Sequence, residues 1–232
     1  MKKQIKAILF DFDGVIADTM EDNFLAWRKA FKDYGVDIKK EDYFPLEGMK
    51  LTEVAREISN KYNVHSDPET IVKLKNEYYL KNHSFCFYPK VIELIDLFKK
   101  NKNLLAVVSA SPREKLDKTV PKEFLVKFDV IISQEDSTNG KPSPDPYLNA
   151  AKKLKISPAE CLVIENAPLG IKSAKKAGMY CIAICSTLDK TFLSEADEII
   201  DKFEDLEKLE IITSLIKKDF AKWQSFILSD KK

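Results

Sequence analysis

Short runs of consecutive apolar residues alternate with segments of helical spacing over most of the chain. The apolar runs lie at 6–10, 104–108, 128–132, 161–164 and 180–184. Runs of this length with no polar face are typical of strands buried on both sides of a parallel sheet. Between them, apolar residues recur at three- and four-residue intervals over 91–98, 146–154 and 168–177, the spacing of amphipathic helices. The alternation predicts an α/β fold with a doubly wound, Rossmann-like parallel sheet.

The last part of the chain is expected to add an edge strand and a long helix. Ile199-Ile200 is short enough for a strand at the edge of the sheet, and apolar residues continue at helical spacing over 206–228. Trp223 and Phe226 in that helix either pack on the core or face a second subunit. A monomer and a weak homodimer are therefore both compatible with the sequence.

Residues 18–85 differ from the rest because they show helical spacing and no strand-like alternation. Phe24, Trp27 and Phe31 fall on one helix face, and Gly35 is a stop signal soon after them. We therefore predict an all-helical domain inserted at 18–85 into a core domain made of residues 1–17 and 86–232.

The composition excludes several classes of protein. The chain has 232 residues with 38 Lys and Arg against 37 Asp and Glu, a formal net charge of +1. This balance argues against nucleic-acid and anionic-membrane partners. No apolar run approaches the ~20 residues of a membrane span, and Asp11 and Asp13 interrupt the first apolar stretch too early for a signal peptide. The four cysteines form no C-x-x-C pair and are expected to be reduced thiols of a cytoplasmic protein.

Four clusters of polar residues each lie just after a predicted strand. They are Asp11 and Asp13, Ser109, Lys141, and the pair Glu165-Asn166. In an open parallel sheet, residues beyond the carboxyl ends of the strands converge on one crevice. Four weak signals therefore become one candidate site.

Asp11 and Asp13 lie two positions apart, so both point the same way if the segment stays extended. Two carboxylates at one sheet edge repel unless a cation lies between them, and Mg²⁺ prefers such oxygen ligands. Asp11 could then attack phosphorus, and Asp13 could protonate the leaving oxygen and later deprotonate water. Gly14 would allow a tight turn after the strand. The alternative interpretation is a surface turn rich in aspartate.

The other clusters suit a phosphate group. Ser109, Ala110 and Ser111 end a strand and offer a hydroxyl and backbone N–H groups, although an ordinary helix cap has the same pattern. Lys141 lies in a proline-flanked loop and would screen the charge of Asp11 against an incoming dianion; most lysines, however, are simply solvated. Glu165 and Asn166 add two oxygen ligands for a metal, or form a polar turn.

The ordered motifs D-F-D-G-V, V-V-S-A-S, G-K-P-S-P-D-P-Y and V-I-E-N-A-P-L-G resemble those of the haloacid dehalogenase superfamily of phosphohydrolases. The resemblance implies a Mg²⁺ cofactor, an aspartyl-phosphate formed on Asp11, acid–base work by Asp13, and phosphate contacts from Ser109 and Lys141. It also implies that the helical insert is the small cap of the first subfamily. An acid at position 13 favours phosphoryl transfer over dehalogenation. The implied metal ligands are Asp11, Asp13, Glu165 and Asn166.

A closer resemblance is to beta-phosphoglucomutase and its phosphatase relatives, through Asp18-Thr19, Ala26-Trp27 and Lys75-Asn76. The sequence departs from the mutases at three positions. Asn23 replaces a histidine, Leu51 replaces an arginine that grips a second phosphate, and Asn166 replaces a metal-binding aspartate. Lys50, next to Leu51, offers a charge without a bidentate fork. The candidate phosphate- and substrate-binding residues are Gly14, Thr19, Asn23, Trp27, Lys50, Lys75, Ser109, Ala110, Ser111 and Lys141.

These residues support three hypotheses. The first is a Mg²⁺-dependent phosphatase that hydrolyses a small phosphorylated metabolite, such as a sugar phosphate. The second is a phosphoglucomutase-like isomerase, which would use Asp13, Thr19 and Lys75. The third is a protein that binds a phosphorylated ligand without turnover, as the neutral Asn166 suggests.

Overall fold

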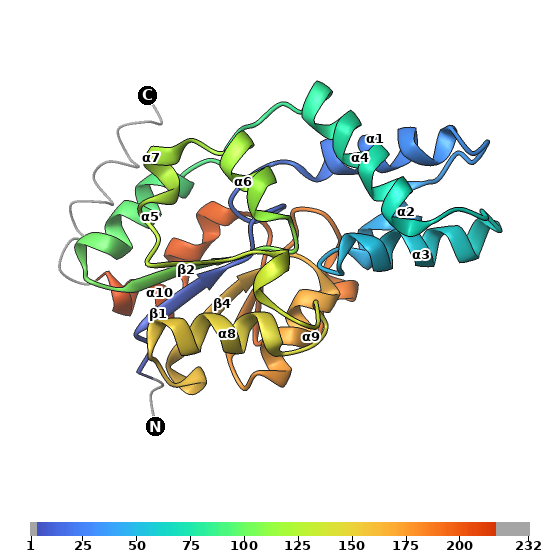
Figure 1. The fold of residues 1–232 in the computed structure, drawn as a ribbon. Helices are drawn as coiled ribbons and strands as arrows, with labels where there is room; N and C mark the ends of the chain where they lie inside the picture. The colour runs from blue at the N-terminus through green and yellow to red at the C-terminus, as the bar shows by residue number, and fades with distance from the viewer. Residues whose placement is uncertain (1–3, 217–232) are drawn as a thin grey trace.

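The computed structural model describes residues 4–216 and contains a six-stranded parallel sheet in the order β3-β2-β1-β4-β5-β6 (Figure 1). The strands are β1 (Ala7–Phe10), β2 (Leu104–Val108), β3 (Val130–Ile132), β4 (Cys161–Glu165), β5 (Tyr180–Ile184) and β6 (Glu198–Ile200). This confirms the predicted parallel sheet, including the edge strand at Ile199-Ile200.

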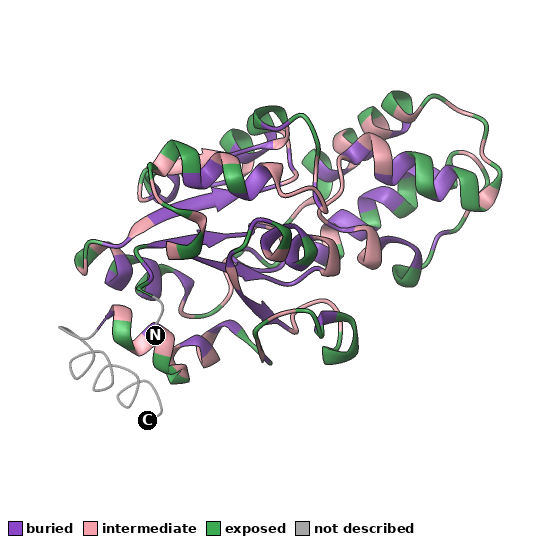
Figure 2. Ribbon diagram, turned by 90° about the horizontal axis from the view of Figure 1, so that it is seen from below, coloured by how far each residue is buried: buried purple, intermediate pink, exposed green. Residues whose placement is uncertain are grey.

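Helices cover both faces of the sheet, as a doubly wound fold requires. They are α5 (Val91–Lys100), α6 (Arg113–Thr119), α7 (Lys122–Leu125), α8 (Asp145–Leu154), α9 (Pro168–Lys176) and α10 (Glu210–Leu215). Successive strand residues point to opposite faces. Ile8 and Phe10 therefore pack with α5, α6, α7 and α10, whereas Ala7 and Leu9 pack with α8 and α9. The strands are buried on both sides and the outer helix faces are exposed (Figure 2).

Short 3-10 turns occupy several connections between these elements. They are η2 (Gln134–Asp136), η3 (Pro158–Glu160), η4 (Lys190–Leu193) and η5 (Phe203–Lys208). The single turn predicted at Ser157–Glu160 is η3. The predicted helix over 206–228 is wrong at its start. Phe203 and Leu206 are buried in η5, and Leu209 is extended before α10 begins. Trp223 and Phe226 lie outside the described residues.

A separate helical layer lies beyond the carboxyl ends of the strands (Figure 1). It contains α1 (Met20–Lys32), α2 (Lys40–Tyr43), η1 (Phe44–Leu46), α3 (Leu51–Tyr62) and α4 (Pro68–Asn82). Its own apolar core includes Phe24, Trp27, Phe31, Val54 and Ile58. We call this layer the cap. An all-helical insert is what the sequence predicted, and the domain boundaries at 17/18 and 85/86 stay predictions.

Two neighbouring chain segments connect the cap to the sheet. Asp18 donates its backbone N–H to the carbonyl of Cys86 at 3.0 Å, and Tyr88 donates to Ile16 at 3.1 Å. Because both crossings lie side by side, the cap is attached along one narrow seam. The four cysteines are free thiols, with Cys161 and Cys181 buried and Cys86 exposed. Within residues 4–216 no helix has the length and apolarity to cross a membrane.

Candidate active site

The sheet register brings Asp11 and Glu165 to the same level. Phe10 pairs with Val107 on one side and with Ile164 on the other. The next residues along these three strands, Asp11, Val108 and Glu165, therefore form one row at the carboxyl edge. The backbone N–H of Asp11 donates to the carbonyl of Ile164 at 2.9 Å, which continues the pairing one step beyond β1.

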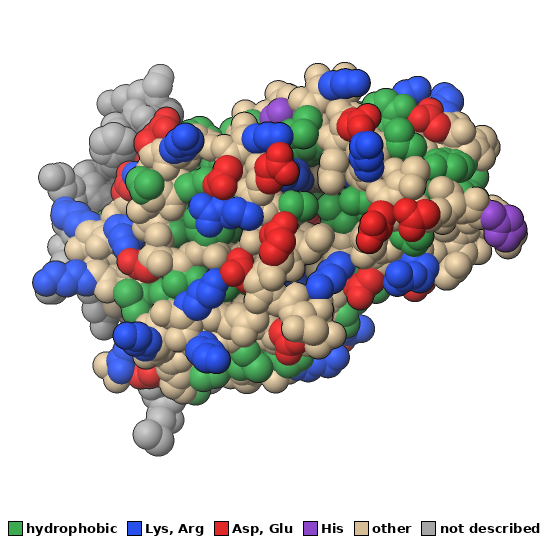
Figure 3. Space-filling model, in the orientation of Figure 1, with side chains coloured by type: hydrophobic (Ala, Val, Ile, Leu, Met, Phe, Trp, Pro, Cys, Tyr) green, Lys and Arg blue, Asp and Glu red, His purple; other side chains and the backbone are tan. Residues whose placement is uncertain are grey.

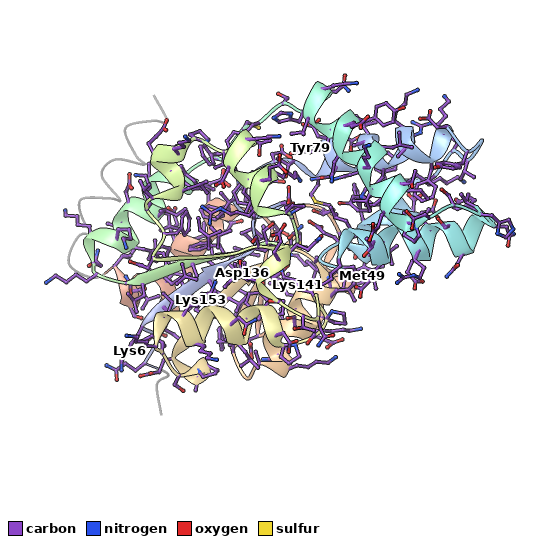
Figure 4. The ribbon with its side chains drawn as sticks, in the orientation of Figure 1. Lys6, Met49, Tyr79, Asp136, Lys141 and Lys153 are labelled. Atoms are coloured by element: carbon purple, nitrogen blue, oxygen red, sulfur yellow. The ribbon has the colours of Figure 1, made fainter. Side chains whose placement is uncertain are left out.

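Lys141 enters this row from the loop before α8. Its Nζ donates to Asp11 Oδ1 at 2.5 Å, to Glu165 Oε1 at 2.6 Å and to the Val108 carbonyl at 3.2 Å. Burial alone would lower the pKa of Lys141, but the negative charges of Asp11 and Glu165 raise it above its ordinary value. The ammonium therefore stays charged beside Asp11. Figure 4 shows Lys141 where the sheet meets the cap, with Met49 of the cap nearby.

Protein donors occupy both oxygens of Glu165. Oε1 accepts from Lys141 and from the Tyr147 hydroxyl at 2.8 Å, and Oε2 accepts the backbone N–H groups of Asn166 and Ala167 at 2.9 and 3.1 Å. Gly170 makes this possible, because a Cβ there would lie 1.7 Å from Glu165 Oε1. The geometry makes Glu165 a brace for Lys141. The assignment of Glu165 as a metal ligand stays a prediction.

Asp13 has a different set of partners. Its Oδ1 accepts from Thr19 Oγ1 at 2.5 Å and Asn23 Nδ2 at 3.0 Å, and its Oδ2 accepts from Ser111 Oγ at 3.2 Å. Lys115 Nζ lies 3.6 Å from Oδ1. Burial alone would raise the pKa of Asp13, but the charge of Lys115 and these hydrogen bonds hold the pKa below its usual value.

Asn23 links this cluster to the cap. Its side-chain oxygen accepts from Lys75 at 2.7 Å and from Lys115 at 3.2 Å, while its amide donates to Asp13. Burial and the neighbouring charge of Lys115 hold the pKa of Lys75 well below its ordinary value. Both ammonium groups lie over the ring of Tyr79, at 4.9 and 4.1 Å from its centroid. Asn23 thus bridges the acid–base candidate and two lysines.

Burial raises the pKa of Asp11 to about 8, with the charges of Glu165 and Asp13 adding to this and Lys141 opposing it. Burial and the charges of Asp11 and Asp13 likewise raise the pKa of the cap residue Glu47 well above its ordinary value. Burial and the crowding of carboxyl groups therefore favour the protonated forms of Asp11 and Glu47. A bound cation would favour their carboxylate forms instead.

The residues at this edge fit a divalent cation. Asn166 is fully buried, and its Oδ1 has no hydrogen-bond partner. Together with the carboxylate of Asp11 it supplies the hard oxygen donors that Mg²⁺ prefers. The assignment of Asp11, Asp13, Glu165 and Asn166 as metal ligands stays a prediction. Within residues 4–216, no three His, Cys, Asp or Glu side chains converge as a metal-binding group. Asp13 is held by Thr19 and Ser111, and Glu165 by Lys141.

A small cavity of about 30 Å³ lies between the sheet edge and the cap. The core side is lined by Asp11, Asp13, Ala110, Ser111, Glu165 and Ala167, and the cap side by Asn23, Tyr43, Glu47, Gly48, Met49, Leu51 and Val54. A single water needs ~10–15 Å³ on this measure. The cap is therefore closed over the site, with room for little more than an ion or two waters.

Other predicted residues have clear positions. Gly14 has a φ of +84°, and a Cβ there would lie 2.1 Å from Asn166 Nδ2. The turn predicted at Gly14 is confirmed, and it also lets Asn166 approach. Ser109 is buried, and its hydroxyl accepts the N–H of Ser111 at 3.0 Å.

Of two further predicted substrate contacts, Trp27 lies away from the cavity and Lys50 lies beside it. The structure puts Trp27 in the apolar core of the cap, fully buried against Phe31 and Tyr43, and not at the cavity. Lys50 lines a second small cavity beside Ser109, Ala110 and Lys141, but its ammonium donates to the carbonyl of Thr138 at 2.6 Å. Lys50 is therefore close to the site, with its charge directed at a core loop.

Sequence reasoning missed Glu47, Lys115 and Tyr147. Lys115 comes four residues after Ser111, and in the structure its Nζ donates to Ser111 Oγ at 3.1 Å. That spacing was a usable signal. Glu47 lies in an irregular cap segment and Tyr147 on a helix face, and neither position follows a predicted strand.

Comparisons with known proteins agree with this geometry. The family model described as haloacid dehalogenase-like hydrolase matches residues 8–184. Validoxylamine A 7'-phosphate phosphatase of Streptomyces hygroscopicus subsp. limoneus is 28% identical over 197 residues, covering 84% of this chain and 92% of that protein. Protein SUPPRESSOR OF QUENCHING 1, chloroplastic, of Arabidopsis thaliana is 32% identical over 83% of this chain, which spans 19% of that much longer protein.

Among solved structures, beta-phosphoglucomutase from Clostridium difficile superposes with a TM-score of 0.78 at 27% identity, covering 94% of this chain and 99% of that one. The chain belongs to the haloacid dehalogenase-like hydrolase family. It is an enzyme that acts on phosphate esters, and its relatives include both phosphatases and a phosphoglucomutase.

Proposed function

We propose that this protein is a Mg²⁺-dependent phosphatase that hydrolyses a small phosphomonoester through an aspartyl-phosphate on Asp11. The separation of the two aspartates carries the proposal. Asp11 is held by Lys141, whereas Asp13 is held by Thr19, Asn23, Ser111 and Lys115. Two carboxyl groups with different environments can take the separate roles of nucleophile and acid–base catalyst.

In the first step a carboxylate oxygen of Asp11 bonds to phosphorus, and the bond between phosphorus and the ester oxygen breaks. Asp13 is a carboxylate before the substrate binds; a phosphate dianion bound beside it would raise its pKa, and the proton that Asp13 then takes up passes to the departing alcohol. In the second step water attacks the phosphoryl group on Asp11, and Asp13 takes the water's proton. The P–O bond to Asp11 breaks, so phosphate leaves and both aspartates return to their starting states.

Lys141 and the 109–111 segment hold the transferred group in this scheme. The Lys141 ammonium faces Asp11 and offsets the charge that builds on the phosphoryl oxygens. Ala110 and Ser111 line the cavity beside Asp13. A divalent cation held by Asp11 and Asn166 would screen the approaching phosphate dianion from the carboxylates.

The cap side of the cavity favours a phosphatase over a mutase. A mutase intermediate carries two phosphates, so the cap must present cations to the second one. Within the described part of the chain, the cap residues that line the cavity include no lysine or arginine, and Leu51 and Glu47 lie there instead. Lys50 lines an adjoining small cavity beside Ser109, but its ammonium donates to the Thr138 carbonyl. The buried Lys75 donates to Asn23. The likeness to beta-phosphoglucomutase keeps the mutase as the second candidate.

The test is phosphate release from an aryl phosphate and from a panel of sugar phosphates, with Mg²⁺ and with EDTA. We expect Mg²⁺-dependent turnover, none for Asp11→Asn, and a loss of ~10²–10⁴-fold for Asp13→Asn. Asp96→Asn, which removes an exposed carboxylate on α5, should retain wild-type turnover.

Three results would contradict the proposal in different ways. Turnover by Asp11→Asn would refute the assignment of Asp11 as the nucleophile. Conversion of beta-glucose 1-phosphate to glucose 6-phosphate faster than phosphate release would indicate a mutase. Tight binding of a phosphorylated metabolite without turnover on any substrate would indicate a binding protein.

A further inference from the structure

Glu47 places a buried carboxylate of the cap at the sheet edge. It lies between η1 and α3, is 7% exposed, and lines the same cavity as Asp11 and Asp13. Its Oε2 accepts from Asn166 Nδ2 at 3.1 Å, and its Oε1 is buried with no hydrogen-bond partner. A carboxylate buried this deeply is costly unless a positive charge compensates it.

The cations nearest to the cavity are already used by other groups. Lys141 binds Asp11 and Glu165, and Lys115 binds Asp13, Ser111 and Asn23. Lys75 donates to Asn23. No ion pair joins Glu47 to a Lys or Arg between residues 4 and 216. Lys141 is close enough to act on Glu47, but its ammonium is paired with Asp11 and Glu165, so Glu47 has no cation partner of its own among the described residues.

The orientation of Asn166 supports the same conclusion. Its Nδ2 donates to Glu47 Oε2 and to Thr187 Oγ1 at 2.9 Å, both of which can accept. This leaves Oδ1, the oxygen, as the atom without a partner. Asn166 thus offers a metal a neutral oxygen, and its amide holds the carboxylate of Glu47 beside it.

We propose that Glu47 provides this cation site with the carboxylate ligand that the neutral Asn166 lacks, so that metal binding and cap closure are coupled. The inference rests on the proposed function, because it assumes a divalent cation at Asp11. The ligand belongs to the cap, so opening the cap withdraws one negative charge from the site and weakens its hold on the metal. By linkage, a bound metal favours the closed cap to the same extent.

Calorimetric titration with Mg²⁺ tests the charge assignment directly. We expect Glu47→Gln to raise the Mg²⁺ dissociation constant about tenfold or more. Asn166→Asp should lower it, because a third carboxylate joins the site. The double variant Glu47→Gln/Asn166→Asp has the wild-type charge and should return to within about threefold of wild type. Glu57→Gln, which removes an exposed cap carboxylate on α3, is the matched control.

Hydrogen–deuterium exchange of residues 44–51 tests the coupling. In wild type, Mg²⁺ should slow exchange in this segment, which contacts the core through Lys50 and the backbone N–H of Leu51. In Glu47→Gln, Mg²⁺ should leave the exchange unchanged, while circular dichroism and thermal unfolding confirm that the variant is folded.

Different outcomes would refute the proposed function and the role of Glu47. A wild-type protein that binds no Mg²⁺ would refute the proposed function and this inference together. A wild type that binds Mg²⁺ and releases phosphate, with an unchanged Mg²⁺ affinity in Glu47→Gln, would refute the inference alone. Mg²⁺ protection of 44–51 that persists in Glu47→Gln would refute the coupling.

Discussion

Replacing Glu165 with glutamine tests whether this residue braces Lys141. The side chain is fully buried and accepts four hydrogen bonds, two at each oxygen. Oε1 faces Lys141 and Tyr147, and Oε2 faces two backbone N–H groups. Glutamine keeps the shape of the side chain but has one oxygen and one NH₂ group, which can only donate.

The expected cost follows from this mismatch. Turned toward Asn166 and Ala167, the NH₂ faces two backbone donors; turned the other way, it faces the Lys141 ammonium, which only donates, and the Tyr147 hydroxyl, which can rotate and accept. A buried donor left without a partner costs ~1–3 kcal/mol. At least one such donor predicts that Glu165→Gln lowers the free energy of unfolding by about 1–3 kcal/mol or more. Lys141 also loses a charged partner, so turnover should fall together with stability.

Urea unfolding in EDTA measures this loss without any metal contribution. Glu114→Gln is the control, because it weakens an exposed pair with Lys118 and should cost less than about 1 kcal/mol. A Glu165→Gln variant within about 1 kcal/mol of wild type would refute the reasoning. The brace would then be unimportant for stability.

Two further substitutions test Asp13 and Gly14. Lys115→Met removes the charge that lowers the pKa of Asp13, so that pKa should rise. Asp13 must be unprotonated to take the proton of water in the second step, so the acid-side fall of kcat, which reports this step, should begin at a higher pH. Lys118→Met, exposed on the same helix, should leave the profile unchanged. Gly14→Ala should lower the unfolding free energy in urea by about 1–3 kcal/mol more than Gly35→Ala. Both glycines have positive φ, but only Gly14 would place a Cβ against Asn166; equal losses would contradict this.

The fold was largely predictable because its strands are continuous apolar runs. Burial on both faces leaves Leu104–Val108 and Cys161–Ile164 without polar positions, which makes them easy to recognise. The predicted strand 128–132 is shorter in the structure. Phe128 belongs to a turn and packs in the core, and the Asp129 carboxylate accepts the N–H of Leu105. The short helices α2, α6 and α7 gave too few turns for their spacing to be recognised.

Site residues that come after a strand were predictable from the sequence. Site residues that reach the cavity through packing of the cap were not. Asp11, Asp13 and Lys141 meet because the register of the sheet requires it. Glu47 reaches the same place through the docking of a separate helical layer, and no local pattern marks such a contact. On the face shown in Figure 3, Lys and Arg side chains are interspersed with Asp and Glu, as the balanced charge of the sequence predicts.

The closed position of the cap over the cavity has a practical consequence for crystallography. A space of about 30 Å³ is too small for a phosphate ester, so a substrate would require the cap to move away from the sheet. Complexes should therefore be prepared by mixing ligand and protein in solution before crystal packing holds the cap in this position.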